Sequence, residues 1–281
     1  NMAEIKKILI ANRGEIVQRA IRTIREMGKK SVAVYSAGDK NASYLKHADE
    51  AVCIGPAKSK DSYLNSMNIL SAALTTGAQA IHPGFGFLSE NSKFATMCEE
   101  MHIKFIGPAG SVMDKMGDKI NARSEMVKAN VPVIPGSDGE VYTGQEALKI
   151  ADKIGYPVML KASAGGGGKG IRKVEKKEDL LAAFESASQE AVAAFGNGAM
   201  YLEKVIYPAR HIEVQILGDS FGHIIHLGER DCSLQRNNQK VLEESPSIAI
   251  GKTLRTQMGE AAVRAAKAVG YENAGTIEFL L

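Results

Sequence analysis

The segment most suited to chemistry is a run of four glycines flanked by lysines. It occupies residues 161–170 and has the sequence KASAGGGGKG. Consecutive glycines expose backbone N–H groups with no side chains in the way, so an anion can approach them closely. Lys161 and Lys169 add positive charge near the two ends. The pattern favours a polyphosphate ligand over a plain flexible hinge, because a hinge has no need of flanking lysines.

Two well-known nucleotide motifs do not fit this glycine segment. The Walker P-loop needs a glycine, four residues and then Gly-Lys-Ser/Thr opening a helix, and that order is missing here. The dinucleotide fingerprint would follow the first strand of the chain, whereas these glycines lie far from it. We therefore expect a phosphate-binding loop between two strands of a small domain.

A second concentration of polar groups lies at residues 229–240, with the sequence ERDCSLQRNNQK, directly after an apolar strand. Glu243 and Glu244 follow closely. We interpret the stretch as a charge-rich loop, in which groups of both signs indicate a cluster around a site. No residue that could act as a general base lies at an informative sequence spacing from Cys232. We therefore interpret Cys232 as a structural residue rather than as a nucleophile.

Two further segments lie on predicted strands. Glu278 stands between Ile277 and Phe279, where a carboxylate is costly to bury unless it is paired or bound to a metal. Mg²⁺ takes one or two carboxylates together with nucleotide phosphates, so Glu278 is a candidate ligand. Residues 203–206 end another strand, whose backbone groups could hydrogen-bond an adenine edge. A surface ion pair is the alternative for that segment.

The loops after two other strands leave structural and binding roles open. Residues 12–15, with the sequence NRGE, open a helix whose N-terminus can bind an anion, although Glu15 also fits plain dipole stabilisation. Residues 82–91, with the sequence HPGFGFLSEN, lead to Ser89, a predicted helix N-cap. We interpret this second loop as a rigid turn, in which His82 could touch a ligand.

The elements that must position these groups alternate along the first part of the chain. Short apolar strands are expected at residues 7–11, 31–35, 51–54, 78–81 and 104–106. Helices are expected at residues 14–28, 61–76, 90–101 and 111–130. Strands that alternate with helices predict an α/β fold with a doubly wound, mostly parallel sheet.

The segment VPVIPG at residues 131–136 breaks this pattern, and we place a domain boundary near Pro135. A small α+β lid is expected next, with helices at 145–154 and 177–194 and strands at 158–161, 171–174 and 200–203. A hairpin of strands 213–217 and 223–227, a helix at 253–269 and a strand at 276–281 follow. The predicted domains are an N-terminal domain at 1–110, a linker helix at 111–135, a lid at 136–204 and the start of a C-terminal domain at 205–281.

Composition excludes several classes of protein. Among 281 residues, 35 Lys and Arg against 32 Asp and Glu give a net charge of +3, too balanced to predict nucleic-acid binding. No apolar run approaches the roughly 18 residues of a membrane span, and the first residues lack the apolar core of a signal peptide. Cys53, Cys98 and Cys232 lie too far apart for a disulfide framework or a four-thiolate zinc site. We expect a cytoplasmic protein with no nucleic-acid or membrane partner.

Taken together, the motifs resemble those of the biotin carboxylase family of the ATP-grasp superfamily. The resemblance is carried by KILIANRGEI at residues 7–16, MGDK at 116–119, the loop at 82–91, the glycine segment and the stretch at 229–240. It runs through the whole chain in order. It implies an ATP-grasp fold with an N-terminal doubly wound domain, an α+β lid, and a C-terminal domain from near Val205. ATP would lie between the lid and the C-terminal domain.

The resemblance also implies roles for individual residues. Lys240 matches the family lysine that helps bind bicarbonate, and Glu278 matches one of two carboxylates on Mg²⁺ or Mn²⁺. Asn238 stands where some members carry His, and Asn237 replaces a basic residue common there. The implied ATP-binding residues are Lys119 and Lys161 at the phosphates, Gly167 and Gly168 in the closing loop, Glu203, Lys204, Val205 and Ile206 at the adenine, and His211, Gln235 and Asn238 at the ribose.

The implied reaction is the first half-reaction of acetyl-CoA carboxylase in fatty acid synthesis. Bicarbonate attacks ATP to give carboxyphosphate, which carboxylates biotin on a biotin carboxyl carrier protein. Carboxyltransferase subunits are the further partners, and the family forms homodimers. The family's general base, second metal carboxylate and catalytic arginines match no residue up to Leu281. We therefore expect that the natural protein continues and that this chain alone is inactive.

Three alternatives stay open at this point. The biotin carboxylase regions of pyruvate carboxylase and propionyl-CoA carboxylase are similar to the same motifs. Another ATP-grasp ligase, joining a carboxylate to an amine, is disfavoured by the stretch at residues 229–240. A non-catalytic nucleotide-binding fragment is the remaining alternative.

Overall fold

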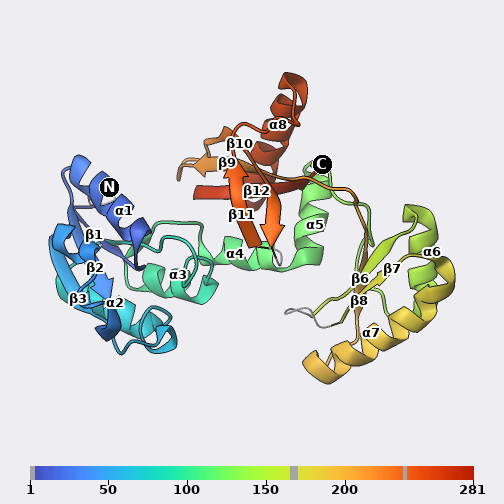
Figure 1. Cartoon of the computed structure of the whole chain (residues 1–281), viewed down its shortest axis with the longest axis horizontal. Coiled ribbons are helices and arrows are strands. Elements are labelled where there is room, and N and C mark those ends of the chain that lie inside the picture. The colour runs from blue at the N-terminus through green and yellow to red at the C-terminus, as the bar shows by residue number, and fades with distance from the viewer. Residues whose placement is uncertain (1–3, 165–169, 237–238) are drawn as a thin grey trace. The chain divides into compact units, whose positions relative to one another are not determined.

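A computed structural model describes residues 4–164, 170–236 and 239–281 of the chain (Figure 1). The chain divides into two compact units. The first contains Asn1–Asp114 with Leu217–His223 and Gly270–Gly275, and the second contains Lys115–Ile216, Ile224–Val269 and Thr276–Leu281. The boundary expected near Pro135 and the four predicted domains remain predictions.

The first unit is built on a five-stranded sheet with the order β3-β2-β1-β4-β5. Every neighbouring pair in it is parallel, which confirms the doubly wound prediction. Side chains such as Leu9, Val32 and Ile81 are fully buried, as expected for strands covered on both faces. The strands are β1 (Lys7–Ile10), β2 (Lys30–Tyr35), β3 (Glu50–Cys53), β4 (Ala80–His82) and β5 (Lys104–Phe105).

Two helices in this unit start later than predicted because asparagines cap them. The helices are α1 (Glu15–Glu26), α2 (Ser66–Thr76) and α3 (Ser92–Glu100). The prediction of Ser89 as the N-cap of α3 is wrong, since the Asn91 side chain accepts the Phe94 N–H. Helix α2 likewise begins after Asn65, later than expected, and a 3₁₀ turn at Ser59–Asp61 precedes it.

The single helix predicted at 111–130 is two helices, α4 (Gly110–Gly117) and α5 (Lys119–Lys128). Asp118 lies between them in an extended conformation, and its carboxylate accepts the Asn121 N–H. An aspartate in this position satisfies a free N–H of the new helix and so favours a fresh start. The prediction of one helix was wrong because apolar spacing alone does not show such a cap.

A three-stranded antiparallel sheet forms the part of the second unit that corresponds to the predicted lid. Its order is β7-β6-β8, with β6 (Val158–Ala162), β7 (Ile171–Val174) and β8 (Met200–Lys204). Helices α6 (Gly144–Ile154) and α7 (Leu180–Phe195) cover one face, where Leu160 and Leu202 are buried (Figure 1). Because side chains alternate along a strand, Lys161, Tyr201 and Glu203 belong to the other face.

Most of a four-stranded sheet with the order β11-β10-β9-β12 belongs to the second unit. Its strands are β9 (His211–Gly218), β10 (Ile224–Arg236), β11 (Gln239–Glu244) and β12 (Asn273–Leu280). The prediction of a loop at 229–240 was wrong, because β10 continues to Arg236 and Gln235 pairs with Lys240 of β11. The polar residues of β10 share the strand with buried Cys232 and Asp231, so polarity there does not mark a loop.

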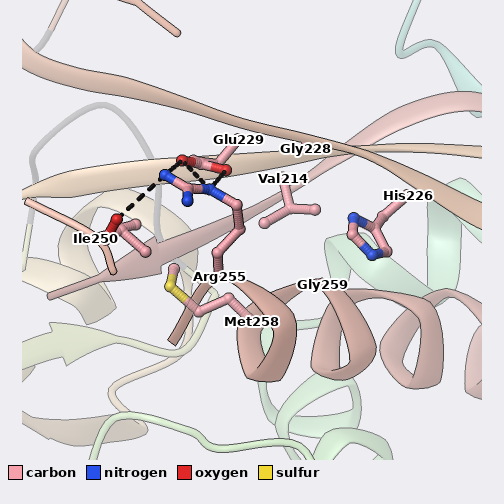
Figure 2. Close-up of a pocket in the computed structure, with 8 residues that line it drawn as sticks. All are labelled: Val214, His226, Gly228, Glu229, Ile250, Arg255, Met258 and Gly259. Carbon is pink, nitrogen blue, oxygen red and sulfur yellow. Dashed lines mark hydrogen bonds and ion pairs between the residues drawn. The ribbon is translucent and has the colours of Figure 1, made fainter. Parts of the chain in front are cut away.

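Helix α8 (Lys252–Val269) is fixed to this sheet by an ion pair (Figure 2). Arg255 Nε of α8 lies 2.9 Å from both carboxylate oxygens of Glu229 on β10. The hydrogen bond from Arg255 lowers the pKa of the buried Glu229 carboxyl. Gly259 lets the helix pass close to His226, since a Cβ atom there would lie 2.5 Å from the imidazole. Helix and sheet are therefore joined by both charge and close packing.

The three cysteines are all free thiols. Cys53 is exposed, whereas Cys98 and Cys232 are buried. Burial raises the pKa of Cys232 to about 11 and that of Cys98 to about 12. A thiol that stays protonated is a poor nucleophile, which supports the structural role predicted for Cys232. In the part of the chain that the structure describes, no helix combines the length and apolarity needed to cross a membrane.

Candidate active site

The four-stranded sheet carries an ionic network to which three of the predicted site residues belong. His211 Nδ1 of β9 lies 3.6 Å from Glu278 Oε1 of β12. The same Glu278 oxygen lies 4.0 Å from Lys240 Nζ of β11, and Lys240 hydrogen-bonds Glu213 of β9. The structure thus brings together residues that are as much as 67 positions apart, His211 and Glu278.

Glu213 is the centre of this network. Its side chain is only 6% exposed, and Arg230 Nε donates to Oε1 at 2.6 Å while Lys240 donates to Oε2. Burial by itself would raise the pKa of the Glu213 carboxyl, but the hydrogen bonds from Lys240 and Arg230 outweigh it and hold the pKa below its ordinary value. Glu213 is therefore a permanent anion held between two cations.

Lys240 gains both a charge and a fixed position from this arrangement. Burial would lower the pKa of its ammonium, but the hydrogen bond to Glu213 outweighs burial and raises the pKa. The Lys240 side chain is 34% exposed, so the ammonium can still meet a ligand. Gln235 lies opposite Lys240 in the β-ladder, and its side-chain amide N–H donates a hydrogen bond to the Cys232 carbonyl at 3.0 Å. A fixed cation of this kind suits a small anion.

Glu213 and Arg230 were not singled out from the sequence. A signal for Glu213 exists in β9, where His211, Glu213 and Gln215 alternate with buried Ile212, Val214 and Ile216. A period of two places the three polar residues on one side of the strand. The prediction placed this strand at residues 213–217 as one arm of a hairpin, and did not use the alternation.

On the lid sheet, Lys161 and Glu203 form an ion pair with 2.5 Å between Nζ and Oε2. Both side chains are about 30% exposed (30% and 28%), unlike buried Glu213. Within the second unit these two residues line a groove of about 720 Å³, together with Ile206, His211 and Glu278. This volume lies in the range of small-molecule sites, roughly 300–1,000 Å³. Five of the predicted site residues therefore share one groove.

The side chain of Lys204 has a structural role. Its ammonium donates to the carbonyls of Gly155 and Tyr156, at 2.9 and 2.5 Å, just beyond the end of α6. A cation there satisfies free carbonyls and complements the helix dipole. The adenine contact predicted for Lys204 is left to its backbone.

The backbone donors of the segment 203–206 are partly used. Lys204 N donates to the Pro135 carbonyl at 2.7 Å, and Val205 N donates to the Pro157 carbonyl at 3.0 Å. No hydrogen bond joins the Ile206 N–H to another residue that the structure describes. Ile206 therefore keeps an open backbone donor, and the adenine contact expected for this segment remains a prediction.

Four predicted ATP-binding residues cannot be compared with the geometry. Gly167, Gly168 and Asn238 lie outside the described residues. Lys119 begins α5, but its side chain also lies outside what the structure describes. Their roles remain predictions.

The two loops at the carboxyl ends of β1 and β4 brace each other. Asn12 Nδ2 donates to the carbonyls of Pro83 and Phe85, each at 2.8 Å. Gly84 has φ +65°, and a Cβ atom there would lie 2.6 Å from Asn12 Nδ2, so only glycine fits. Burial lowers the pKa of His82, whose Nδ1 accepts the Gly84 N–H at 3.0 Å. These contacts support the interpretation of the segment as a rigid turn.

Comparison with known proteins gives two family matches in series. Residues 4–113 match the family model "Biotin carboxylase, N-terminal domain". Residues 118–281 match "Carbamoyl-phosphate synthase L chain, ATP binding domain". Biotin carboxylase 1 of Bacillus subtilis is 56% identical over 98% of this chain and 61% of its own length. Biotin carboxylase of Nostoc sp. is 58% identical over 98% of this chain and 62% of its own.

Solved structures agree with these matches. A biotin carboxylase–β,γ-ATP complex from Campylobacter jejuni superposes with a TM-score of 0.88 at 58% identity, covering 99% of this chain and 62% of that one. The biotin carboxylase domain dimer of Hydrogenobacter thermophilus 2-oxoglutarate carboxylase, bound to MgADP, ADP and bicarbonate, gives 0.85 at 51% identity, with coverage of 99% and 61%.

Fold and matches together define an α/β protein of the ATP-grasp class. Within that class, the chain belongs to the biotin carboxylase family. It spans 61–62% of the length of the curated biotin carboxylases from Bacillus and Nostoc.

Proposed function

We propose that the protein containing this chain carboxylates biotin in an ATP-dependent reaction with bicarbonate. The observation that carries the proposal is Lys240, a charged and accessible ammonium that buried Glu213 holds beside Glu278 and His211. Relatives named biotin carboxylase at 54–58% identity support it. So do the related structures bound to an ATP analogue and to MgADP with bicarbonate.

The nucleotide would lie along the groove of the second unit. Lys161 binds its phosphates, aided by Lys119 and by the glycine loop with Gly167 and Gly168. The Ile206 N–H meets the adenine edge, beside Glu203, Lys204 and Val205. His211, Gln235 and Asn238 lie on the ribose side. The assignments of Lys161, Glu203, Ile206 and His211 are supported by the groove that these residues share, and that of Ile206 also by its open backbone donor.

Glu278 fits the role of a metal ligand. Its side chain is 53% exposed, and the nitrogens of His211 and Lys240 nearest to it are 3.6 and 4.0 Å away, so no short ion pair occupies the carboxylate. Mg²⁺ or Mn²⁺ bound there would take its remaining ligands from nucleotide phosphates and water. When bound, the ion would neutralise charge on the transferred phosphoryl group.

In the proposed reaction a bicarbonate oxygen attacks the γ-phosphorus of ATP, and ADP leaves. The C–O bond of the product, carboxyphosphate, then breaks as its carboxyl group passes to a biotin nitrogen, and the departing phosphate takes up the proton of that N–H group. Phosphoryl transfer depends mainly on position and on charge neutralisation. Lys240 binds the bicarbonate anion, and Glu213 keeps Lys240 charged and in place.

At a finer level, we propose the first half-reaction of acetyl-CoA carboxylase in a cytoplasmic enzyme. The partners are a biotin carboxyl carrier protein and carboxyltransferase subunits, and the enzyme is a homodimer. Pyruvate carboxylase is the second candidate, because one of the pyruvate carboxylase subunits of Methanothermobacter thermautotrophicus is 54% identical over 98% of this chain. Replacing the acyl-CoA acceptor by pyruvate in an assay with the natural partner proteins distinguishes the two.

The bicarbonate role is tested with Lys240→Gln in the complete enzyme. Loss of a charged hydrogen bond should raise the bicarbonate KM about tenfold to a hundredfold, while the KM for ATP stays nearly unchanged. Lys267→Gln, which removes an exposed charge from α8, is the matched control and should change neither KM. An effect of Lys240→Gln confined to ATP would contradict the assignment.

A further inference from the structure

Tyr201 of β8 has no part in the function proposed above. Its side chain is 6% exposed, yet its hydroxyl has no hydrogen-bond partner among the described residues. Burial raises the pKa of this hydroxyl, so it stays a neutral group. Tyr201 lines the same groove as Lys161 and Glu203. A buried aromatic residue on the groove side of the lid sheet calls for an explanation beyond core packing.

The register of the lid sheet places Tyr201 directly opposite Lys161. Lys161 Nζ lies 5.7 Å from the centre of the Tyr201 ring, within the range of a cation–π contact. Glu203 lies two residues further along β8, within diagonal reach, and its Oε2 is 2.5 Å from the same ammonium. Strand β8 thus offers Lys161 two partners, one charged and one aromatic.

The two partners respond differently to a bound phosphate. The Glu203 carboxylate competes with phosphate for the ammonium, because both are anions. The Tyr201 ring attracts the ammonium without neutralising it. An ammonium that leaves Glu203 for phosphate can therefore keep its contact with the ring.

We propose that Tyr201 is a positioning residue for Lys161. Its aromatic face holds the ammonium over the groove while the ammonium binds a nucleotide phosphate. The inference rests on the proposed ATP-binding role of Lys161. A ring that only filled space would matter for stability and not for the selective binding of phosphate.

The test compares ATP with adenosine as calorimetric ligands of the complete enzyme. Tyr201→Met keeps much of the buried volume without an aromatic face, and should weaken ATP binding about three- to tenfold, the size of a partly desolvated cation–π contact. Adenosine, which lacks phosphates, should bind as to wild type. Tyr201→Phe keeps the ring and should match wild type for both ligands. Phe184→Met is the control, because Phe184 is equally buried on the helix side of the lid and should lower only thermal stability.

Three results would overturn the inference. Equal weakening of ATP and adenosine by Tyr201→Met would make the ring a packing residue. A loss in Tyr201→Phe as large as in Tyr201→Met would transfer the role to the hydroxyl. A further loss from Tyr201→Met in the Lys161→Gln background would show that Tyr201 does not act through Lys161.

Two measurements keep the test decisive if other steps fail. If Tyr201→Met does not fold, NMR of the wild-type protein with bound ATP is the alternative test. The Tyr201 ring should shift the resonances of the Lys161 Cε protons upfield. The absence of such a shift would overturn the inference. Wild type that binds no ATP would overturn the proposed function instead. Wild type that binds ATP, with a loss in Lys161→Gln and none in Tyr201→Met, would overturn the Tyr201 inference alone.

Discussion

The two sheets of the second unit each carry a lysine–glutamate pair, but the pairs are built differently. On the lid sheet, Lys161 and Glu203 are both about 30% exposed (30% and 28%). On the four-stranded sheet, Glu213 is 6% exposed and accepts hydrogen bonds from both Lys240 and Arg230. The first pair can separate when a ligand competes for the lysine. The second has a surplus of cations around one buried anion, so Lys240 keeps its place.

The difference predicts different energetic roles. Exposed ion pairs contribute about 0–1 kcal/mol to stability, since water and salt screen them. Removing one partner of a buried pair costs roughly 3–5 kcal/mol, because the other charge is left unpaired. The cations around Glu213 are 30% and 34% exposed, so water offsets part of that cost. The lid pair therefore suits a binding element that changes partners, and the Glu213 cluster suits a preformed anion site.

The largest effect on stability is expected for Glu213→Gln. The amide keeps the size of the side chain but leaves Lys240 and Arg230 without their anion. We expect a loss of about 1–3 kcal/mol in the free energy of unfolding, between the values for exposed and buried pairs. Urea unfolding measures it. Glu243→Gln, at an exposed partner 3.5 Å from Arg230, is the control, and an equal loss in both variants would remove the distinction between the two sheets.

An intermediate and pH-dependent effect is expected for Glu229→Gln. Glu229 is buried and pairs with Arg255, whose hydrogen bond lowers the pKa of the carboxyl. A lowered folded-state pKa gives stability that is present above the unfolded value, near 4.3, and lost as the pH falls through the folded value. The free energy of unfolding at pH 7 should therefore be larger for wild type than for Glu229→Gln. This difference in unfolding free energy should become smaller below about pH 4. Unfolding curves from pH 7 to pH 3 check this, and a gap that widens in acid would contradict the pairing.

The smallest effect on stability is expected for Glu203→Gln on the lid. Its exposed pair with Lys161 should contribute less than about 1 kcal/mol to the free energy of unfolding. Asp152→Asn is the control, since Asp152 forms another exposed lid pair with Lys177 at 2.7 Å. A stability loss as large as that of Glu213→Gln would show that the lid pair is structural.

Local signals in the sequence predicted the five-stranded parallel sheet and the strands of the lid sheet. Parallel strands showed as short apolar runs, and the glycine segment marked Lys161 as the end of a strand. Helix boundaries at Asp118 and Asn91 were missed, since side-chain caps override apolar spacing. Strand β10 was taken for a loop because its polar residues, which form ion pairs with neighbouring elements, hide the pattern of a strand.

The network around Glu213 needed the three-dimensional structure. Glu213, Arg230 and Lys240 come from three neighbouring strands, and only their register shows that two cations share one carboxylate. The pairing of Lys161 with Glu203 has the same origin, since these residues are diagonal neighbours across β6 and β8. Sequence spacing does not define such cross-strand contacts.

The central claim is that Lys161 serves the nucleotide and Lys240 serves bicarbonate. Calorimetric titration of ATP into the complete enzyme tests it most directly, with Lys161→Gln and Lys240→Gln compared side by side. The account predicts that Lys161→Gln weakens ATP binding about tenfold or more, the value of a charged hydrogen bond, while Lys240→Gln stays close to wild type. Equal weakening by the two variants, or a loss confined to Lys240→Gln, would contradict it.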